Sequence, residues 1–258
     1  MQDTLVLGKK WPVKISPAGI DIDDKRNLLY VVTKEDNSLY ILNLITKKIV
    51  GKYQLDGEAY TCLLSPDKKE LYITCWGCDK LIVFNTITRS IGTEINVGDN
   101  PNDICLTKKG NYLFVANAND NSVSVIDVRL KKVIETLTSS LYPDAPQGST
   151  TNGLALSPDE KTLYIANADN NCLAVFDVSK PGKSLSKGFI PTGWYPTSVK
   201  VIGNKIFVTN GKGFSSFPNP NGPNPSYSKS KVAHHEGDTA VAKYSQYIAG
   251  LFIGTMSI

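Results

Sequence analysis

Residues 157–177 read SPDEKTLYIANADNNCLAVFD, and this stretch decides the fold of the chain. A Ser-Pro-Asp turn leads into an apolar–aromatic–apolar triplet centred on Tyr164, and a polar turn then precedes an alternating segment that ends at Asp177. Proline at the second turn position presets the backbone angle, and Asp closes the turn. Alternation with a period of two is typical of a β-strand with one buried face. The stretch therefore predicts two antiparallel strands joined by a hairpin.

The same pattern returns along the chain at nearly constant spacing. The intervals between its aromatic residues are 42, 42, 50 and 43 residues, with the last member a looser match: Tyr30, Tyr72, Phe114, Tyr164 and Phe207. Seven residues after each of the first four comes an Asn or Asp, the types that best tolerate a left-handed hairpin position: Asn37, Asp79, Asn121 and Asn171. A fixed period of this length indicates an array built from one supersecondary unit.

Each repeat unit has room for four strands. Apolar pairs eight and ten residues before the aromatic predict a first strand with one buried face: Ile20/Ile22, Cys62/Leu64, Ile104/Leu106 and Leu154/Leu156. A third strand ends thirteen residues past the aromatic, and a weaker fourth strand closes the unit. Four antiparallel strands in about 42 residues predict an all-β fold, a β-propeller of four-stranded blades.

The units predict one propeller domain over residues 1–258. Their approximate bounds are 18–57, 58–98, 99–150, 151–193 and an incomplete 194–258, which contains a long loop at 211–247. About four and a half units are visible, so we expect the chain to be a fragment of a longer protein. Because open sheet edges favour association, we expect an incomplete ring to dimerise or to close with a strand from residues 4–7.

Composition favours a globular protein without an obvious polyanion partner. The net charge of +4 comes from 28 basic and 24 acidic residues with no basic run along the chain, which gives little support to nucleic acid or membrane binding. No apolar stretch approaches the roughly 18 residues that a membrane span needs. The five cysteines cannot all pair within one chain. For Cys75 and Cys78 we expect a disulfide at a hairpin tip or two free thiols, rather than a redox or zinc pair.

The irregular segments all belong to one face of the predicted propeller, where the strand 2–3 hairpins and the strand 4–1 crossovers emerge. Functional residues concentrate in variable loops on a rigid scaffold, so this face is the candidate binding surface. The alternatives are that loops simply tolerate insertion and that the aromatic side chains plug the propeller mouth. The candidate ligand or partner contacts are Trp76, Tyr142, Asp144, Trp194, Tyr195, Asn210, Lys212 and Phe214.

Other polar residues receive weaker functional interpretations. Asn117, Asn167 and Asn210 end second strands and are expected to cap them by side-chain hydrogen bonds rather than to touch a ligand. His234 and His235 are the only histidines and are weak candidates for metal ligands in a solvated loop. The sequence leads us to expect no metal, no cofactor and no catalytic residue in this chain.

Several segments resemble known propeller families. LYIAN at 163–167, FVAN at 114–117 and SVSVID at 122–127 resemble the YVTN-type propeller repeat. Residues 141–146, 190–197 and 210–213 are similar to the N-terminal propeller of secreted bacterial proteins that continue into an alkaline-phosphatase-type phosphoesterase domain. The resemblance implies seven blades, a periplasmic or extracellular location after removal of a signal peptide, and hydrolase activity in the full-length relatives.

The functional expectation is a non-catalytic propeller that recognises or docks a phosphoesterase domain absent from this chain, because no catalytic motif is present. The alternatives are a lactonase-like hydrolase that uses the propeller mouth and a freestanding saccharide- or peptide-binding protein. The expected partner is an intramolecular phosphoesterase domain, or another protein or a saccharide. Nucleic acid and membrane insertion are not expected.

Overall fold

The computed structural model describes residues 15–142, 145–213 and 254–258, and within them every regular element is a β-strand. Consecutive strands form antiparallel sheets in chain order. The first sheet contains β1 (Pro17–Asp23), β2 (Leu28–Thr33), β3 (Ser38–Asn43) and β4 (Lys48–Gln54). The second contains β5 (Ala59–Leu64), β6 (Glu70–Cys75), β7 (Lys80–Asn85) and β8 (Ser90–Asn96).

Three further sheets continue this arrangement. The third contains β9 (Pro101–Leu106), β10 (Tyr112–Asn117), β11 (Ser122–Asp127) and β12 (Lys132–Thr138). The fourth contains β13 (Thr151–Leu156), β14 (Thr162–Asn167), β15 (Cys172–Asp177) and β16 (Leu185–Pro191). The fifth contains β17 (Trp194–Ile202), β18 (Lys205–Gly213) and β19 (Thr255–Ser257). The described part of the chain has no helix of the length and apolarity that crossing a membrane requires.

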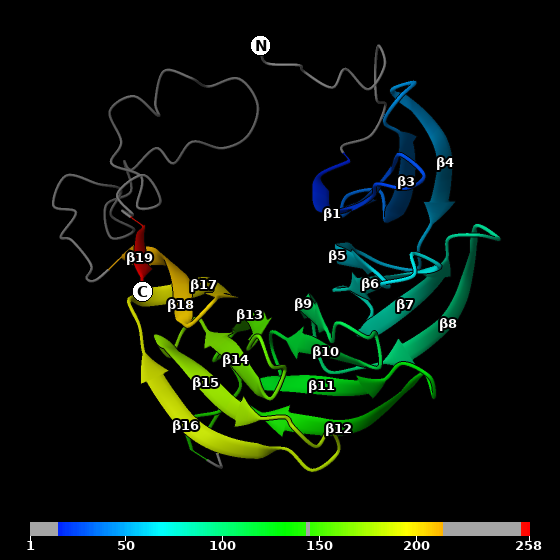
Figure 1. Cartoon of the computed structure of the whole chain (residues 1–258). Helices are drawn as coiled ribbons and strands as arrows, with labels where there is room; N and C mark the ends of the chain where they lie inside the picture. Colours follow the sequence, from blue (N-terminus) through cyan, green and yellow to red (C-terminus); the bar gives the residue numbers. More distant parts are fainter. Residues whose placement is uncertain (1–14, 143–144, 214–253) are drawn as a thin grey trace, which may run out of the picture.

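The five sheets are the blades of a β-propeller, which confirms the predicted fold class. Figure 1 shows them side by side along an arc, with the first strand of each sheet on the inner side and the fourth strands on the outer side. Apolar side chains from neighbouring sheets form a separate hydrophobic cluster at each of the four junctions. The repeat aromatics Tyr30, Tyr72 and Phe114 are almost fully buried in these clusters, each stabilising a junction by about 2 kcal/mol.

The first strand of the first blade departs from the sequence prediction. Ile20 and Ile22 are 63% and 45% exposed, whereas Cys62 and Leu64 at the same positions of blade two are each 5% exposed. Cys62 and Leu64 pack on apolar residues of blade one, such as Tyr30. No described blade precedes β1, so Ile20 and Ile22 lack the neighbour that buries their equivalents. The expectation of a buried face was wrong for this strand.

Each blade contains left-handed residues in its loops. The predicted Asn and Asp positions of the strand 2–3 hairpins all have positive φ: 46° at Asn37, 55° at Asp79, 50° at Asn121 and 53° at Asn171. The strand 3–4 turns use the same conformation at Lys47, Arg89 and Lys131, with φ between 51° and 55°. A left-handed residue with a side chain costs roughly 1 kcal/mol, less for Asn or Asp. The hairpins therefore use the favoured residue types and the turns do not.

The strand order places the connections on two opposite faces. We call the ends that carry the strand 2–3 hairpins and the blade-to-blade crossovers the hairpin face, and the ends that carry the strand 1–2 and 3–4 turns the turn face. The described connections of the hairpin face contain eight acidic residues and one basic residue: Glu35, Asp36, Asp56, Glu58, Asp79, Asp99, Asp120, Asp169 and Lys34. The chain therefore gathers negative charge at one face.

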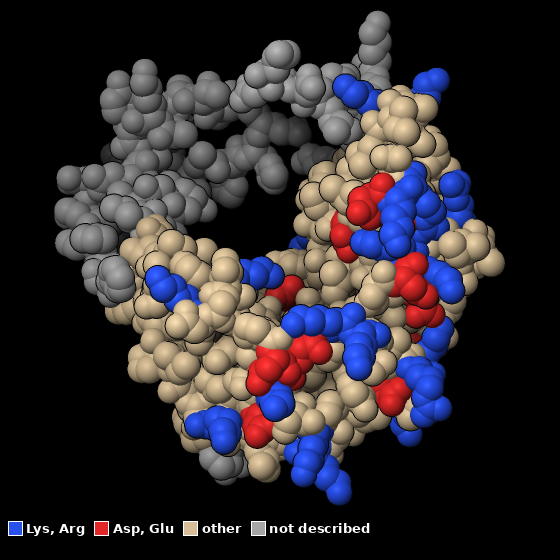
Figure 2. All heavy atoms as spheres, viewed as in Figure 1, with Lys and Arg blue, Asp and Glu red and all other residues tan. Residues whose placement is uncertain are grey.

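The turn face has the opposite charge. Its described connections contain thirteen basic and four acidic residues: Lys25, Arg26, Lys47, Lys68, Lys69, Arg89, Lys108, Lys109, Arg129, Lys131, Lys161, Lys180, Lys183, Asp24, Asp67, Asp159 and Glu160. Lys and Arg side chains follow the outer rim of the arc in Figure 2. The sequence gives no basic run because acidic and basic connections alternate along each blade.

The outer strands share one irregularity. The pairing between the third and fourth strands shifts register at the same place in all four complete blades, after Ile41, Ile82, Val125 and Val175. Each shift inserts an extra residue in the fourth strand, which locally increases its twist.

Candidate functional site at the inner wall and hairpin face

The hairpins of this face hold the crossovers that follow them. Asp79 Oδ1 accepts the backbone N–H of Asn100 at 3.0 Å, and Asn171 Oδ1 accepts that of Tyr195 at 2.8 Å. Asn121 Oδ1 accepts two backbone N–H groups, from Gly148 at 3.1 Å and Ser149 at 2.6 Å. The left-handed hairpin residue therefore positions the first residues of the next inner strand, including Tyr195.

Aromatic and basic side chains from different blades meet on this face. Lys34 Nζ lies 4.8 Å from the centre of the Trp76 ring and 5.6 Å from that of Tyr60, and it pairs with Glu58 Oε2 at 3.7 Å. Lys212 Nζ lies 4.1 Å from the centre of the Tyr195 ring. Each contact contributes of order 1 kcal/mol at a partly exposed site. They hold the rings and their cations in fixed positions.

The Tyr195 hydroxyl lies in a partly buried environment. Burial raises the pKa of the Tyr195 hydroxyl above its ordinary value, and the nearby Asp169 and Tyr60 add to the rise. Tyr60 belongs to the group around Lys34 and lies in β5, whereas Tyr195 belongs to the group around Lys212 and lies in β17.

Only some of the predicted contact residues gather here. Trp76, Tyr195 and Lys212 belong to the cation–π groups, whereas Tyr142 and Trp194 belong to neither group and are 57% and 39% exposed. Whether any of these binds a ligand stays a prediction. Four predicted residues lie outside the described part of the chain: Asp144, Phe214, His234 and His235.

Asn210 has a structural position, as expected for a strand cap. It is 2% exposed, and its Nδ2 donates to Ser257 Oγ at 3.0 Å. Asn117 and Asn167 are fully buried and donate in the same way, to Ser122 Oγ at 2.9 Å and to the Ser139 carbonyl at 2.6 Å. These amides join strand ends within the hairpin face.

In blade two a disulfide-bonded cysteine stands at the repeat position of these asparagines. Cys75 takes the position of Asn117 in the repeat and is bonded to Cys78, so one of the two predicted alternatives is confirmed. The hydroxyls that accept from Asn117, on Ser122 and Ser124, have Lys80 and Ile82 as their equivalents in blade two. An amide there would lack those acceptors, and the covalent bond secures the hairpin that carries Trp76 instead.

The inner wall contains a charged group that the sequence reading missed. Asp103 of β9 accepts the Leu154 N–H of the next inner strand at 2.8 Å through Oδ2, and its own neighbour Ile104 at 2.9 Å through Oδ1. Burial raises the pKa of Asp103 above the ordinary range of an aspartate, although both N–H groups and the charge of Lys200 oppose the rise. Asp103 is therefore a stronger base than an exposed aspartate.

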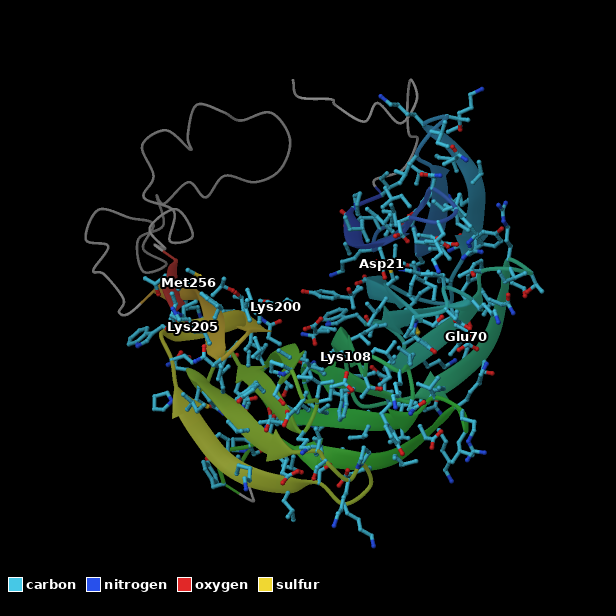
Figure 3. All side chains as sticks on the ribbon, viewed as in Figure 1. Asp21, Glu70, Lys108, Lys200, Lys205 and Met256 are labelled. Atoms are coloured by element: carbon cyan, nitrogen blue, oxygen red, sulfur yellow. A yellow bond between two sulfur atoms is a disulfide. The ribbon has the colours of Figure 1, made fainter. Side chains whose placement is uncertain are left out.

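Small residues lie on the strand between Asp103 and Lys200. The intervening strand β13 has Gly153 and Ala155 at the positions of Asp103 and Cys105 in the repeat. A side chain at Gly153 would lie 3.0 Å from the Ser198 Cα atom, so β13 and β17 approach closely there. In Figure 3, Lys200 and Asp21 lie on the inner side of the arc, on its fifth and first blades. In the described part of the chain, the first strands of the blades thus carry carboxylates such as Asp21 and Asp103 together with the cation of Lys200.

The neighbouring thiol is not a nucleophile at neutral pH. Burial raises the pKa of Cys105 to about 11, so the thiolate that nucleophilic chemistry requires is scarce. Within the described residues no group of three or more His, Cys, Asp or Glu side chains could hold a metal ion. The chemistry that these residues can supply is proton transfer by Asp103 and charge stabilisation by Lys200.

Comparison with known proteins assigns the family. Residues 62–201, more than half of the chain, match the family model described as lactonase, seven-bladed β-propeller. The chain belongs to this lactonase family. A search of curated proteins found no match.

Solved structures share the fold at low identity. The chain superposes on hydrazine synthase from Kuenenia stuttgartiensis with a TM-score of 0.65 and 21% identity, covering 81% of this chain and 58% of that one. A protein from Lactobacillus plantarum gives 0.65 and 21%, covering 75% and 64%. A putative 6-phosphogluconolactonase from Bacteroides uniformis gives 0.63 and 16%, covering 73% and 62%. The chain therefore spans about six-tenths of the length of these propellers.

Proposed function

We propose that this chain provides the inner wall of a lactonase-like hydrolase that opens a small cyclic ester. The observation that carries the proposal is the partly buried carboxyl of Asp103, with its raised pKa, on the inner wall of a lactonase-family propeller whose fifth blade carries Lys200. The putative 6-phosphogluconolactonase among the similar structures supports a sugar lactone as the substrate class.

The chemistry follows from the two groups. Hydrolysis of a lactone begins with attack of water on the ring carbonyl, and a carboxylate of raised pKa is well suited to accept the proton from that water. Negative charge develops on the carbonyl oxygen, and a fixed cation stabilises it. Asp103 takes the first role in this proposal and Lys200 the second. The cation–π groups at the hairpin face supply an aromatic surface at the entrance.

The test is acid release from gluconolactone and 6-phosphogluconolactone, followed in a pH-stat. Asp103→Asn keeps an oxygen for the Leu154 N–H and should lower kcat/KM by about 100-fold or more. The carboxylate is the active form, so kcat/KM should rise with pH through the raised pKa of Asp103 and level off above it. The Asn variant should lack that rise.

A matched control separates the site from the remaining carboxylates. Asp24→Asn makes the same change at an exposed turn and should leave kcat/KM unchanged. Absence of turnover by the wild-type chain, or an Asp103→Asn rate equal to wild type, would refute the proposal. The earlier expectation of a docking module for a phosphoesterase domain stays a prediction without support from the described residues, as do the YVTN assignment and the periplasmic or extracellular location.

A further inference from the structure

The strand 3–4 turns, which form the outer part of the turn face, combine positive charge with exposed aliphatic side chains. Their connecting residues in the four complete blades contain six basic and no acidic residues: Lys47, Arg89, Arg129, Lys131, Lys180 and Lys183. Among the described residues, only Lys131 of these six forms an ion pair, with Glu70 Oε1 at 2.9 Å. The other five form no ion pair with a described residue, although Arg89 Nη1 donates to the Val50 carbonyl at 3.2 Å.

Each turn also exposes an aliphatic side chain beside its cations. Ile45 is 73% exposed, Ile87 61%, Leu130 54% and, at the start of β16, Leu185 65%. Single exposed apolar residues are common on protein surfaces. Here three of them recur in the same turn of successive blades and the fourth directly follows that turn in blade four, and Figure 1 shows these turns spaced along the outer rim of the arc.

The turns hold these side chains outward in a defined conformation. Asn43 Oδ1 accepts the backbone N–H of Ile45 at 3.0 Å, and Asn85 Oδ1 accepts that of Ile87 at 2.9 Å. Asp127 Oδ1 accepts the N–H of Leu130 at 2.9 Å. Such side-chain caps fix a turn before any partner binds, so little ordering is needed on contact.

In three of these turns the left-handed position is occupied by a residue type that does not favour this backbone conformation. Lys47, Arg89 and Lys131 are left-handed, where Gly or Asn would be less strained. The hairpins of the same blades do have Asn or Asp at their left-handed position. Residues that break a local rule without a structural gain are expected at functional positions. Arg89 donates to the Val50 carbonyl at 3.2 Å and Lys131 pairs with Glu70, whereas the exposed Lys47 forms no side-chain hydrogen bond or ion pair with a described residue. Lys47 is therefore the clearest case of a strained cation that is available to a partner.

We propose that the outer turns of the turn face dock the protein on a membrane surface that contains anionic phospholipids. Lys and Arg are attracted to the lipid phosphates, and an aliphatic side chain at the tip enters the boundary between headgroups and acyl chains. A soluble polyanion would match the charges but would gain nothing from Ile45, Ile87 or Leu130. This docking is independent of lactone hydrolysis, since the inner wall and hairpin face contribute nothing to it.

Vesicle co-sedimentation of the whole chain tests the proposal. We expect binding to phosphatidylcholine vesicles with about 30% phosphatidylglycerol, much weaker binding to pure phosphatidylcholine, and loss of binding as salt rises well above 0.1 M. The double variant Lys47→Asn, Arg89→Asn should reduce the partition coefficient roughly 30-fold, from about a fivefold effect per cation. Asn suits the left-handed position, so the variant should fold.

Two further variants make the result specific. Lys52→Asn with Lys80→Asn removes the same charge near the hairpin ends of β4 and β7, away from the outer turns, and should leave the partition coefficient nearly unchanged. Ile45→Ser with Ile87→Ser should weaken vesicle binding about tenfold while leaving any binding to heparin, a soluble polyanion, unaffected. Equal binding to neutral vesicles, or equal weakening by the control pair, would overturn the proposal. Vesicle binding that is unchanged by the two Ile substitutions would instead indicate a site for a soluble polyanion. That result would also overturn the proposal.

Discussion

The two faces of the propeller use the same backbone conformation for different purposes. On the hairpin face the left-handed residue is Asn or Asp, and in three blades its side chain bonds the crossover into the next blade. In the strand 3–4 turns of the first three blades the left-handed residue is Lys or Arg, and two of the three, Lys47 and Arg89, are exposed. The hairpin face therefore joins the blades, while the turn face is available to a partner.

Removing a side chain that connects two blades at the hairpin face should cause the largest loss of stability. Asn121 is 2% exposed, accepts two backbone N–H groups and donates to the Pro146 carbonyl at 2.8 Å. Asn121→Ala loses these bonds and should lower the free energy of unfolding by about 3 kcal/mol, measured by urea denaturation. Lys47→Ala, at the same φ on the turn face, should change it by less than about 0.5 kcal/mol. Equal losses would remove the distinction between the faces.

Removing the disulfide of the hairpin face should cause a somewhat smaller loss of stability. Cys75→Ala with Cys78→Ala frees a short loop and should lower the free energy of unfolding by about 2 kcal/mol. Dithiothreitol should shift the urea midpoint of the wild type by a similar amount and leave the double variant unaffected. An unchanged midpoint in both cases would show that the β6–β7 hairpin does not need the bond.

The smallest predicted effect is a gain in the free energy of unfolding rather than a loss. Lys47→Asn and Arg89→Asn relieve left-handed strain and should each raise the free energy of unfolding by about 0.5 kcal/mol. The reverse exchange, Asn37→Lys on the hairpin face, should lower it by a similar amount. Melting temperatures of the three single variants would measure this. If Lys47→Asn or Arg89→Asn destabilised the fold, the argument that these cations are kept for function would fail.

Most of the fold can be predicted from the sequence because one unit repeats. The aromatic at Tyr72 or Phe114 is buried at a blade junction as a core residue should be, and the hairpin residues have the predicted positive φ. Ile20 and Ile22 show the limit of this reasoning. Their pattern matches that of Cys62 and Leu64, but burial depends on a neighbouring blade that a local pattern does not describe.

The candidate sites were harder to predict, since they depend on what the fold brings together. Asp103 and Lys200 are nearly 100 residues apart. Asp103 is charged at a position where the other complete blades have Gly19, Thr61 and Gly153. A charged residue at a position that is uncharged in the other repeats was the signal that could have pointed to this site. The basic turn face was not predicted because turns with basic residues such as Lys47 and Arg89 alternate along the chain with acidic hairpins. Only the antiparallel strand order places the basic turns on one face and the acidic hairpins on the other.

The repeated register shift in the outer strands has a consequence for behaviour at high concentration. Among the described strands, β4, β8, β12 and β16 each leave one edge without a partner, which is a potential template for joining other chains. The extra residue breaks the regular row of N–H and C=O groups at the centre of that edge. Each strand also has a charged residue near the shift: Lys52, Glu94, Glu135 and Lys187. The same irregularity in four blades thus protects four open edges from aggregation.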